Sequence, residues 1–93
     1  MGLEENTDTE NTIKVYPNPA SHKLFIDFGR NEIEKARVIL YNINGLKVRD
    51  VHLNTRSEKS QELDLSGLSA GLYLLRMSDD HGDVLKTSRI IIR

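Results

Sequence analysis

The 93-residue chain contains no cysteine and no tryptophan. The absence of cysteine excludes disulfides and thiolate metal sites. Lysine and arginine, 13 residues in all, nearly balance the 14 aspartate and glutamate residues, so composition indicates neither a nucleic-acid-binding surface nor an acidic tail. No apolar run approaches the roughly 20 residues of a membrane-spanning helix. The N-terminus also lacks the basic and apolar regions of a signal peptide.

A chain of this length forms one small domain, which leaves little room for a cleft between two lobes. Residues 1–12 are acidic and polar, and Leu3 is their only large aliphatic residue. We predict that they form a flexible linker, because they cannot bury enough apolar surface to offset the entropy of ordering. The folded domain is expected over residues 13–93. We expect the chain to be a terminal module of a larger protein.

From Ile13 onward, short alternating apolar stretches are separated by turn residues. This pattern, with turns about every 8–12 residues, predicts an all-β antiparallel sandwich of about seven strands. Residues 31–41 could be drawn as a helix, but their β-branched residues favour a strand. The seven strands are expected at Ile13–Tyr16, His22–Phe28, Ala36–Ile43, Leu46–Leu53, Gln61–Leu68, Leu72–Ser78 and Val84–Arg93.

Asn44-Gly45 separates two of these strands and predicts a hairpin with a type I′ turn. After this turn, the apolar positions change from even to odd numbers between Val48 and Val51. A strand of period two cannot do this without an inserted residue, so we predict a β-bulge near Arg49-Asp50.

Pro17 and Pro19 lie between the first two strands, and neither can donate to a β-ladder. They predict a stiff segment in which Tyr16 and Asn18 are extended. Such a segment could carry the chain from one sheet to the other. An ordinary inter-strand turn is the alternative.

Among the few aromatic residues, Phe28 and Tyr73 are predicted to lie in the core. Tyr73 follows Gly71 at the start of a strand, which is typical of a tyrosine corner, with Gly71 permitting the tight turn. Phe25 points away from Leu24 and Ile26, so it either packs against a second layer or forms an exposed contact.

The three histidines, His22, His52 and His81, have no spacing typical of metal ligands. His81 lies in "DDHGD", whose carboxylates could bind a cation, but a solvated hairpin turn with Gly82 at positive φ is the preferred interpretation. The chain has no nucleophile elbow and no glycine-rich phosphate loop. We therefore predict no catalytic residue, no metal site and no cofactor.

The segments "VYPNPASHKLFIDF", "LYNINGLKV" and "DLSGLSAGLYLLRM" occur in this order, and a basic final strand follows "DDHG". Together they resemble the type A C-terminal sorting domain of the type IX secretion system, the Por secretion system sorting domain family. The resemblance covers residues 15–93. It implies an immunoglobulin-like antiparallel β-sandwich of about seven strands.

This resemblance also implies a function. Family members are C-terminal export signals of proteins from Bacteroidetes-type bacteria. The outer-membrane translocon and its shuttle protein read the domain, and a sortase cuts upstream and attaches the N-terminal cargo domain to the cell surface. The resemblance thus implies passage through the periplasm to the outer membrane, the cell surface or the medium. It implies no enzymatic activity and no nucleic-acid partner.

The resemblance assigns recognition or motif roles to individual residues in the three segments and in the final strand. The set consists of Pro17, Asn18, Pro19, Gly45, Gly71, Tyr73, Lys86, Arg89 and Arg93. Lysines of the family's final strand are partly replaced by arginine here, which keeps the charge but changes the geometry. We expect the final strand to lie at a sheet edge with free backbone groups, which could bind a receptor or form a homodimer.

Two other functions fit the same fold. The domain could be a structural spacer or adhesion module, because fold alone does not define function. It could also bind glycans, although three tyrosines and two phenylalanines without tryptophan make a poor aromatic platform.

Overall fold

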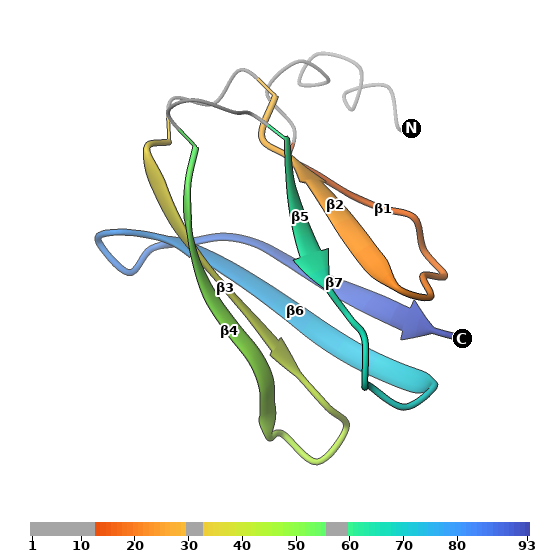
Figure 1. Cartoon of the computed structure of the whole chain (residues 1–93). Helices are drawn as coiled ribbons and strands as arrows, with labels where there is room; N and C mark the ends of the chain where they lie inside the picture. The colour runs from red at the N-terminus through yellow and green to blue at the C-terminus, as the bar shows by residue number, and fades with distance from the viewer. Residues whose placement is uncertain (1–12, 30–32, 56–59) are drawn as a thin grey trace, which may run out of the picture.

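A computed structural model of the chain describes residues 13–29, 33–55 and 60–93. These residues form seven antiparallel strands without a helix (Figure 1). The predicted linker, residues 1–12, lies outside the described residues. The strands are β1 (Lys14–Tyr16), β2 (Lys23–Asp27), β3 (Lys35–Tyr41), β4 (Lys47–Asn54), β5 (Ser60–Asp64), β6 (Gly71–Asp79) and β7 (Val84–Ile92).

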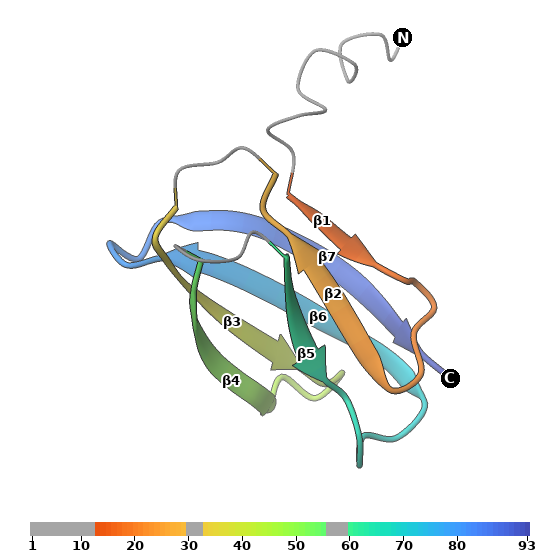
Figure 2. The ribbon, with the colours of Figure 1, turned by 45° about the horizontal axis from the view of Figure 1, so that its top comes forward.

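The strands form a three-stranded sheet in the order β1-β2-β5 and a four-stranded sheet in the order β4-β3-β6-β7. The two sheets face each other in the predicted sandwich (Figure 2). The start of β1 pairs with the end of β2, because Lys14 lies opposite Asp27. We call this end of the sandwich the proximal end. The opposite end, which holds the connection between β3 and β4, is the distal end (Figure 1).

Alternate residues of most strands point into a single core between the sheets. As predicted, Phe28 is fully buried and Tyr73 is only 7% exposed. The other fully buried side chains are mostly aliphatic: Leu24, Ile26, Val38, Leu40, Leu65, Leu75, Met77 and Ile90, together with Thr55.

The hairpin between β3 and β4 is confirmed, but the predicted type I′ turn is wrong. A type I′ turn requires a positive φ at both central residues, here Asn44 and Gly45. Asn44 does not meet this requirement, because no non-glycine residue in the described part has a positive φ. Instead, Asn42 N–H donates to Leu46 O at 2.9 Å, and Gly45 N–H donates to Asn42 O at 3.0 Å. Within this turn, only Gly45 has a left-handed backbone conformation, with φ 82°. The turn thus spans three residues, with glycine in the last position.

The β6–β7 hairpin has the same construction. Asp79 Oδ1 accepts hydrogen bonds from the N–H groups of His81 and Asp83, both at 2.9 Å. Asn42 Oδ1 accepts equivalent bonds from Asn44 and Leu46 in the other hairpin. An asparagine or aspartate immediately before the three-residue loop therefore organises each turn.

The predicted bulge lies one residue earlier than expected. Leu40 is opposite Arg49 and Tyr41 is opposite Lys47, so Val48 is the inserted residue of β4. Val48 and Val51 both pack against the core, which requires this change of phase.

The bulge also directs Arg49 toward the edge of the other sheet. Its guanidinium donates to Asp64 O at 2.9 Å and to Ser66 O. A third bond, of 2.8 Å, goes to Val48 O. Arg49 thus connects the start of β4 to the end of β5, which belongs to the other sheet.

An ion pair connects β3 and β4 on the outer face of the four-stranded sheet. Arg37 Nε and Nη2 donate to the two carboxylate oxygens of Asp50 at 2.9 and 2.7 Å, and Lys47 Nζ lies 3.3 Å from Oδ2. The Arg37 hydrogen bonds, with help from Lys47, hold the pKa of Asp50 well below its ordinary value.

This shift predicts a pH dependence of stability. Because the folded-state pKa of Asp50 lies below the unfolded value of about 3.9, the ion pair stabilises the fold above that pH. Its contribution is lost as the pH falls below about 4 toward the folded-state pKa. We expect the difference in melting temperature between the wild type and Arg37→Gln to shrink on titration from pH 7 toward pH 2. A difference that stays constant over this range would contradict the assignment.

Candidate recognition surface

The proline segment connects the two sheets. β1 and β2 belong to the three-stranded sheet, but Ala20, between them, forms a parallel bridge with Ile92 of β7. Ala20 N–H donates to Ile91 O at 2.8 Å, and Arg93 N–H donates to Ala20 O at 2.9 Å. The first of the two predicted interpretations, a crossover between sheets, is therefore confirmed. Pro17 and Pro19 leave this segment without competing ladder donors.

Asn18 completes the connection through its side chain. Its Nδ2 donates to Arg89 O at 2.8 Å, and its Oδ1 accepts from Ile91 N–H at 3.0 Å. The carboxamide presents a donor and an acceptor side by side, as a peptide group does. It therefore pairs with the edge of β7 at a position where the flanking prolines lack N–H groups.

The prediction that the final strand has free backbone groups is thus wrong over its last part. β7 lies at the end of the four-stranded sheet, but Asn18 and Ala20 occupy the carbonyl of Arg89, both backbone groups of Ile91 and the N–H of Arg93. Outward backbone groups in a strand recur every second residue, so this contact closes the edge from Arg89 onward. Strand addition or dimerisation at this stretch would require displacement of the proline segment.

Tyr73 forms the predicted tyrosine corner. Its hydroxyl donates to Ser69 O at 2.7 Å while the ring is buried. Both glycines of this connection have a positive φ that other residues rarely adopt, 85° at Gly67 and 153° at Gly71. Gly71 is therefore required at the start of β6, as predicted, and Gly67 is a second glycine on which the turn depends.

Tyr73→Phe should lower the free energy of unfolding by about 1 kcal/mol, because it removes one hydrogen bond and leaves the ring in place. The change is measured by urea denaturation at pH 7. We expect a lower midpoint concentration of urea and an unchanged slope of the free energy of unfolding against urea concentration. The carbonyl of the exposed Ser69 can be hydrated in the variant. An unaltered midpoint would show that the corner does not stabilise the domain.

The structure gathers most of the predicted recognition residues at the distal end. Arg93 and Ala20 pair beside the proline segment, Gly71 lies opposite Ile92, and Gly45 lies in the distal hairpin. Arg89 and Tyr73 border one pocket with Gly45. Lys86 is separate, because it pairs with Met77 toward the proximal end of β6.

Of the two alternatives predicted for Phe25, the structure shows the exposed contact. It stacks on Tyr16 across β1 and β2, with ring centroids 5.7 Å apart and an interplanar angle of 26°. Tyr16 is 45% exposed, so the pair forms an aromatic contact on the outer face of the three-stranded sheet.

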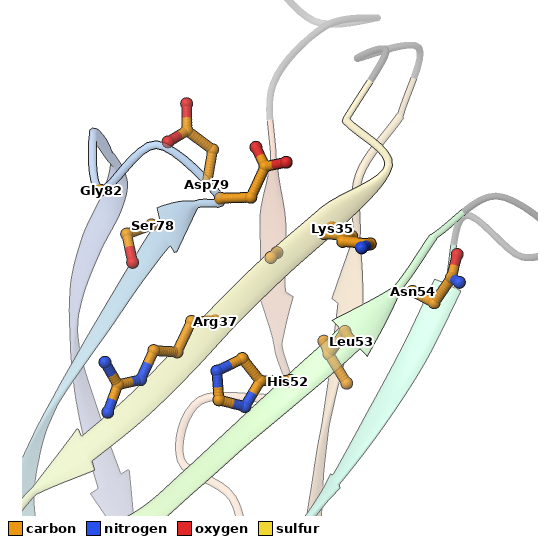
Figure 3. A pocket seen from close by; sticks show the side chains of 10 residues that line it. Lys35, Arg37, His52, Leu53, Asn54, Ser78, Asp79 and Gly82 are labelled. Carbon is orange, nitrogen blue, oxygen red and sulfur yellow. The ribbon is translucent and has the colours of Figure 1, made fainter.

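A second pocket lies on the outer face of the four-stranded sheet at its proximal end (Figure 3). Ser78, His52 and Asp79 border it and could suggest a nucleophile, base and acid. However, Arg37 lies between His52 and Ser78 in the register of three adjacent strands. The two Cα atoms are therefore about 10 Å apart. Within the described residues no hydrogen bond joins Ser78 to His52, so the pocket contains no nucleophile–base pair.

The ligand atoms of Asp79, Asp80 and His81 lie within 4.8 Å of one another. The hairpin accounts for this cluster, because Asp79 Oδ1 already accepts two backbone hydrogen bonds and His81 Nδ1 lies 3.4 Å from Asp80. Gly82 has φ 90°, in agreement with the predicted turn.

Sequence reasoning missed the outward-facing residues of β6 and β3. Tyr41, Leu72, Leu74 and Arg76 border the distal pocket together with Arg89. The stretch "LYLL" gave a signal, because its residues are apolar on both faces of a strand.

No helix in the described parts of the chain is long and apolar enough to cross a membrane.

The fold is thus a small antiparallel β-sandwich that brings most of its motif residues, with the exception of Lys86, to one end. The chain matches the family described as the secretion system C-terminal sorting domain over residues 14–93, and it belongs to this family. No curated protein matches the chain. As a type IX sorting domain, the protein is non-catalytic and acts in export and surface sorting.

Proposed function

We propose that this domain directs an N-terminal cargo protein across the outer membrane through contact with the type IX translocon and its shuttle protein. A sortase then cuts within the linker of residues 1–12 and attaches the cargo to the cell surface. The observation that carries this proposal is the convergence of the family's motif residues at the distal end. The linker precedes Ile13 at the proximal end, so a cut there leaves the distal end undisturbed.

The final strand contributes to recognition through its side chains. Arg89 and Arg93 are exposed at the distal end, and their backbone groups are held by Asn18 and Ala20. Pro17, Asn18 and Pro19 therefore act by fixing the strand that presents these cations. Lys86 adds a half-buried cation farther along the same strand.

Deletion of residues 89–93 cannot test this role, because it also removes Ile90 and Ile92 from the core. The sharper experiment fuses the full chain to an exported reporter in a type IX-competent host. Mass spectrometry of the surface reporter should place its new C-terminus before Ile13. Arg89→Gln/Arg93→Gln should reduce surface reporter, whereas a reporter that is displayed uncut, or equally with both substitutions, would contradict the proposal.

A further inference from the structure

The outer face of the four-stranded sheet carries an exposed apolar patch at its distal end. We call Tyr41, Ile43, Leu72, Leu74 and Ile91 the distal patch. Ile43, Leu72, Leu74 and Ile91 are 76%, 46%, 40% and 45% exposed, respectively. The register makes the strand part of the patch continuous, because Tyr41 is opposite Leu74 and Leu72 is opposite Ile91. Exposed apolar clusters on small domains mark interaction sites.

The patch is hollowed beside the distal hairpin. A pocket of about 560 Å³ lies between the hairpin at Ile43 and the strand residues Leu72 and Leu74. Arg76 and Arg89 form part of its border, and no carboxylate lines it. The pocket can therefore receive apolar side chains with anionic groups next to them.

The arginines at this border differ from Arg37 and Arg49, which have partners within the domain. Arg37 is paired with Asp50, and Arg49 donates to three carbonyl groups. Arg76 and Arg89 have no ion pair or side-chain hydrogen bond within residues 13–29, 33–55 and 60–93. A guanidinium group without a partner in the domain can bind a carboxylate through two hydrogen bonds, because no existing ion pair has to be broken first.

We propose that the distal patch docks a partner polypeptide of the export machinery that carries apolar side chains flanked by carboxylates. This inference rests on the proposed function and names the partner surface that the domain fits. Arg76 and Arg89 fix the partner by ion pairs, while Leu72 and Leu74 supply the apolar contact. Such a centre, apolar with arginine at its border, is typical of the residues that dominate binding energy.

Two other occupants fit the charges less well. A second copy related by a two-fold axis would bring the same patch against itself and place arginine near arginine. An anionic bilayer along this face would also meet Asp79, at the proximal end of β6, and Asp80, which follows it in the turn. β1 begins at the end of the sandwich opposite the distal patch, because Lys14 pairs with Asp27 at the proximal end (Figure 2).

The test compares surface display of a reporter fused to the full chain and three variants. We expect Leu72→Ser/Leu74→Ser and Arg76→Glu/Arg89→Glu each to reduce display by about tenfold, as loss of a binding centre does. The control Lys14→Glu/Lys35→Glu changes the net charge equally at exposed lysines outside the patch and should be displayed like the wild type. Melting temperatures of the purified chains establish that all variants are folded.

The outcomes separate this inference from the proposed function. A wild-type fusion that is displayed together with both patch variants at equal levels overturns the inference and the recognition role of Arg89, but leaves the export function of the domain intact. A wild-type fusion that is not displayed overturns the proposed function. Flotation of the purified chain with phosphatidylglycerol vesicles would identify a lipid and overturn the inference. Sedimentation as a dimer that Leu72→Ser/Leu74→Ser dissociates would identify a second copy and overturn it as well.

Discussion

Replacement of Ile90 by alanine is expected to lower the free energy of unfolding by about 2–4 kcal/mol. Ile90 is fully buried and lies opposite Tyr73, so truncation leaves a cavity beneath the tyrosine corner. Because small domains are stabilised by only about 5–15 kcal/mol, a loss of this size removes a large fraction of the total stability. Urea denaturation followed by circular dichroism measures the effect.

Ile91→Ala is the matched control on the neighbouring residue. Ile91 points to the outer face and is 45% exposed, so its truncation should change the free energy of unfolding by less than about 1 kcal/mol. If Ile91→Ala proved the more destabilising of the two, the register of β7 in this account would be wrong by one residue.

Asn18→Ala should lower the free energy of unfolding by about 1–3 kcal/mol, because it removes both hydrogen bonds to the edge of β7. Asn18→Asp is expected to cost at least as much at pH 7. The carboxylate can still accept from Ile91 N–H, but it cannot donate to Arg89 O and lies against that carbonyl oxygen.

Amide hydrogen exchange makes the Asn18 prediction specific. The Ile91 amide should exchange faster in Asn18→Ala, because its acceptor is lost. The amides of the β3–β4 hairpin, remote from this contact, serve as the internal reference. Unchanged protection at Ile91 would show that the Asn18 contact does not hold the final strand.

Local patterns were sufficient to predict much of the fold. The alternation in Leu24, Ile26 and Phe28 identified a strand and its buried face, and the phase change after Val48 identified the bulge. These features depend on neighbours within one strand, which the sequence displays directly.

Features that depend on distant partners were not predictable in the same way. Asn18 contacts Arg89 and Ile91, which are more than 70 residues away in the chain. The sequence therefore could not show that the edge of β7 is closed. The turn type at Gly45 was mispredicted because Asn42, before the loop, accepts the hydrogen bonds that organise it.

The site was only partly predictable for the same reason. The family's motifs identified Pro17, Asn18 and Tyr73, which form or support the distal end. Leu72, Leu74 and Arg76 become recognisable only when the register places them beside Tyr41 and Arg89 on one outer face. A residue's exposure on a sheet is a property of its neighbours in space.

The measurement that tests the central claim most directly is surface display of one reporter, fused to the full chain, in two hosts that differ only in an active type IX translocon. We expect abundant surface reporter in the host with the translocon and retention of the reporter in the periplasm of the other host. Equal amounts of surface reporter in the two hosts would contradict it.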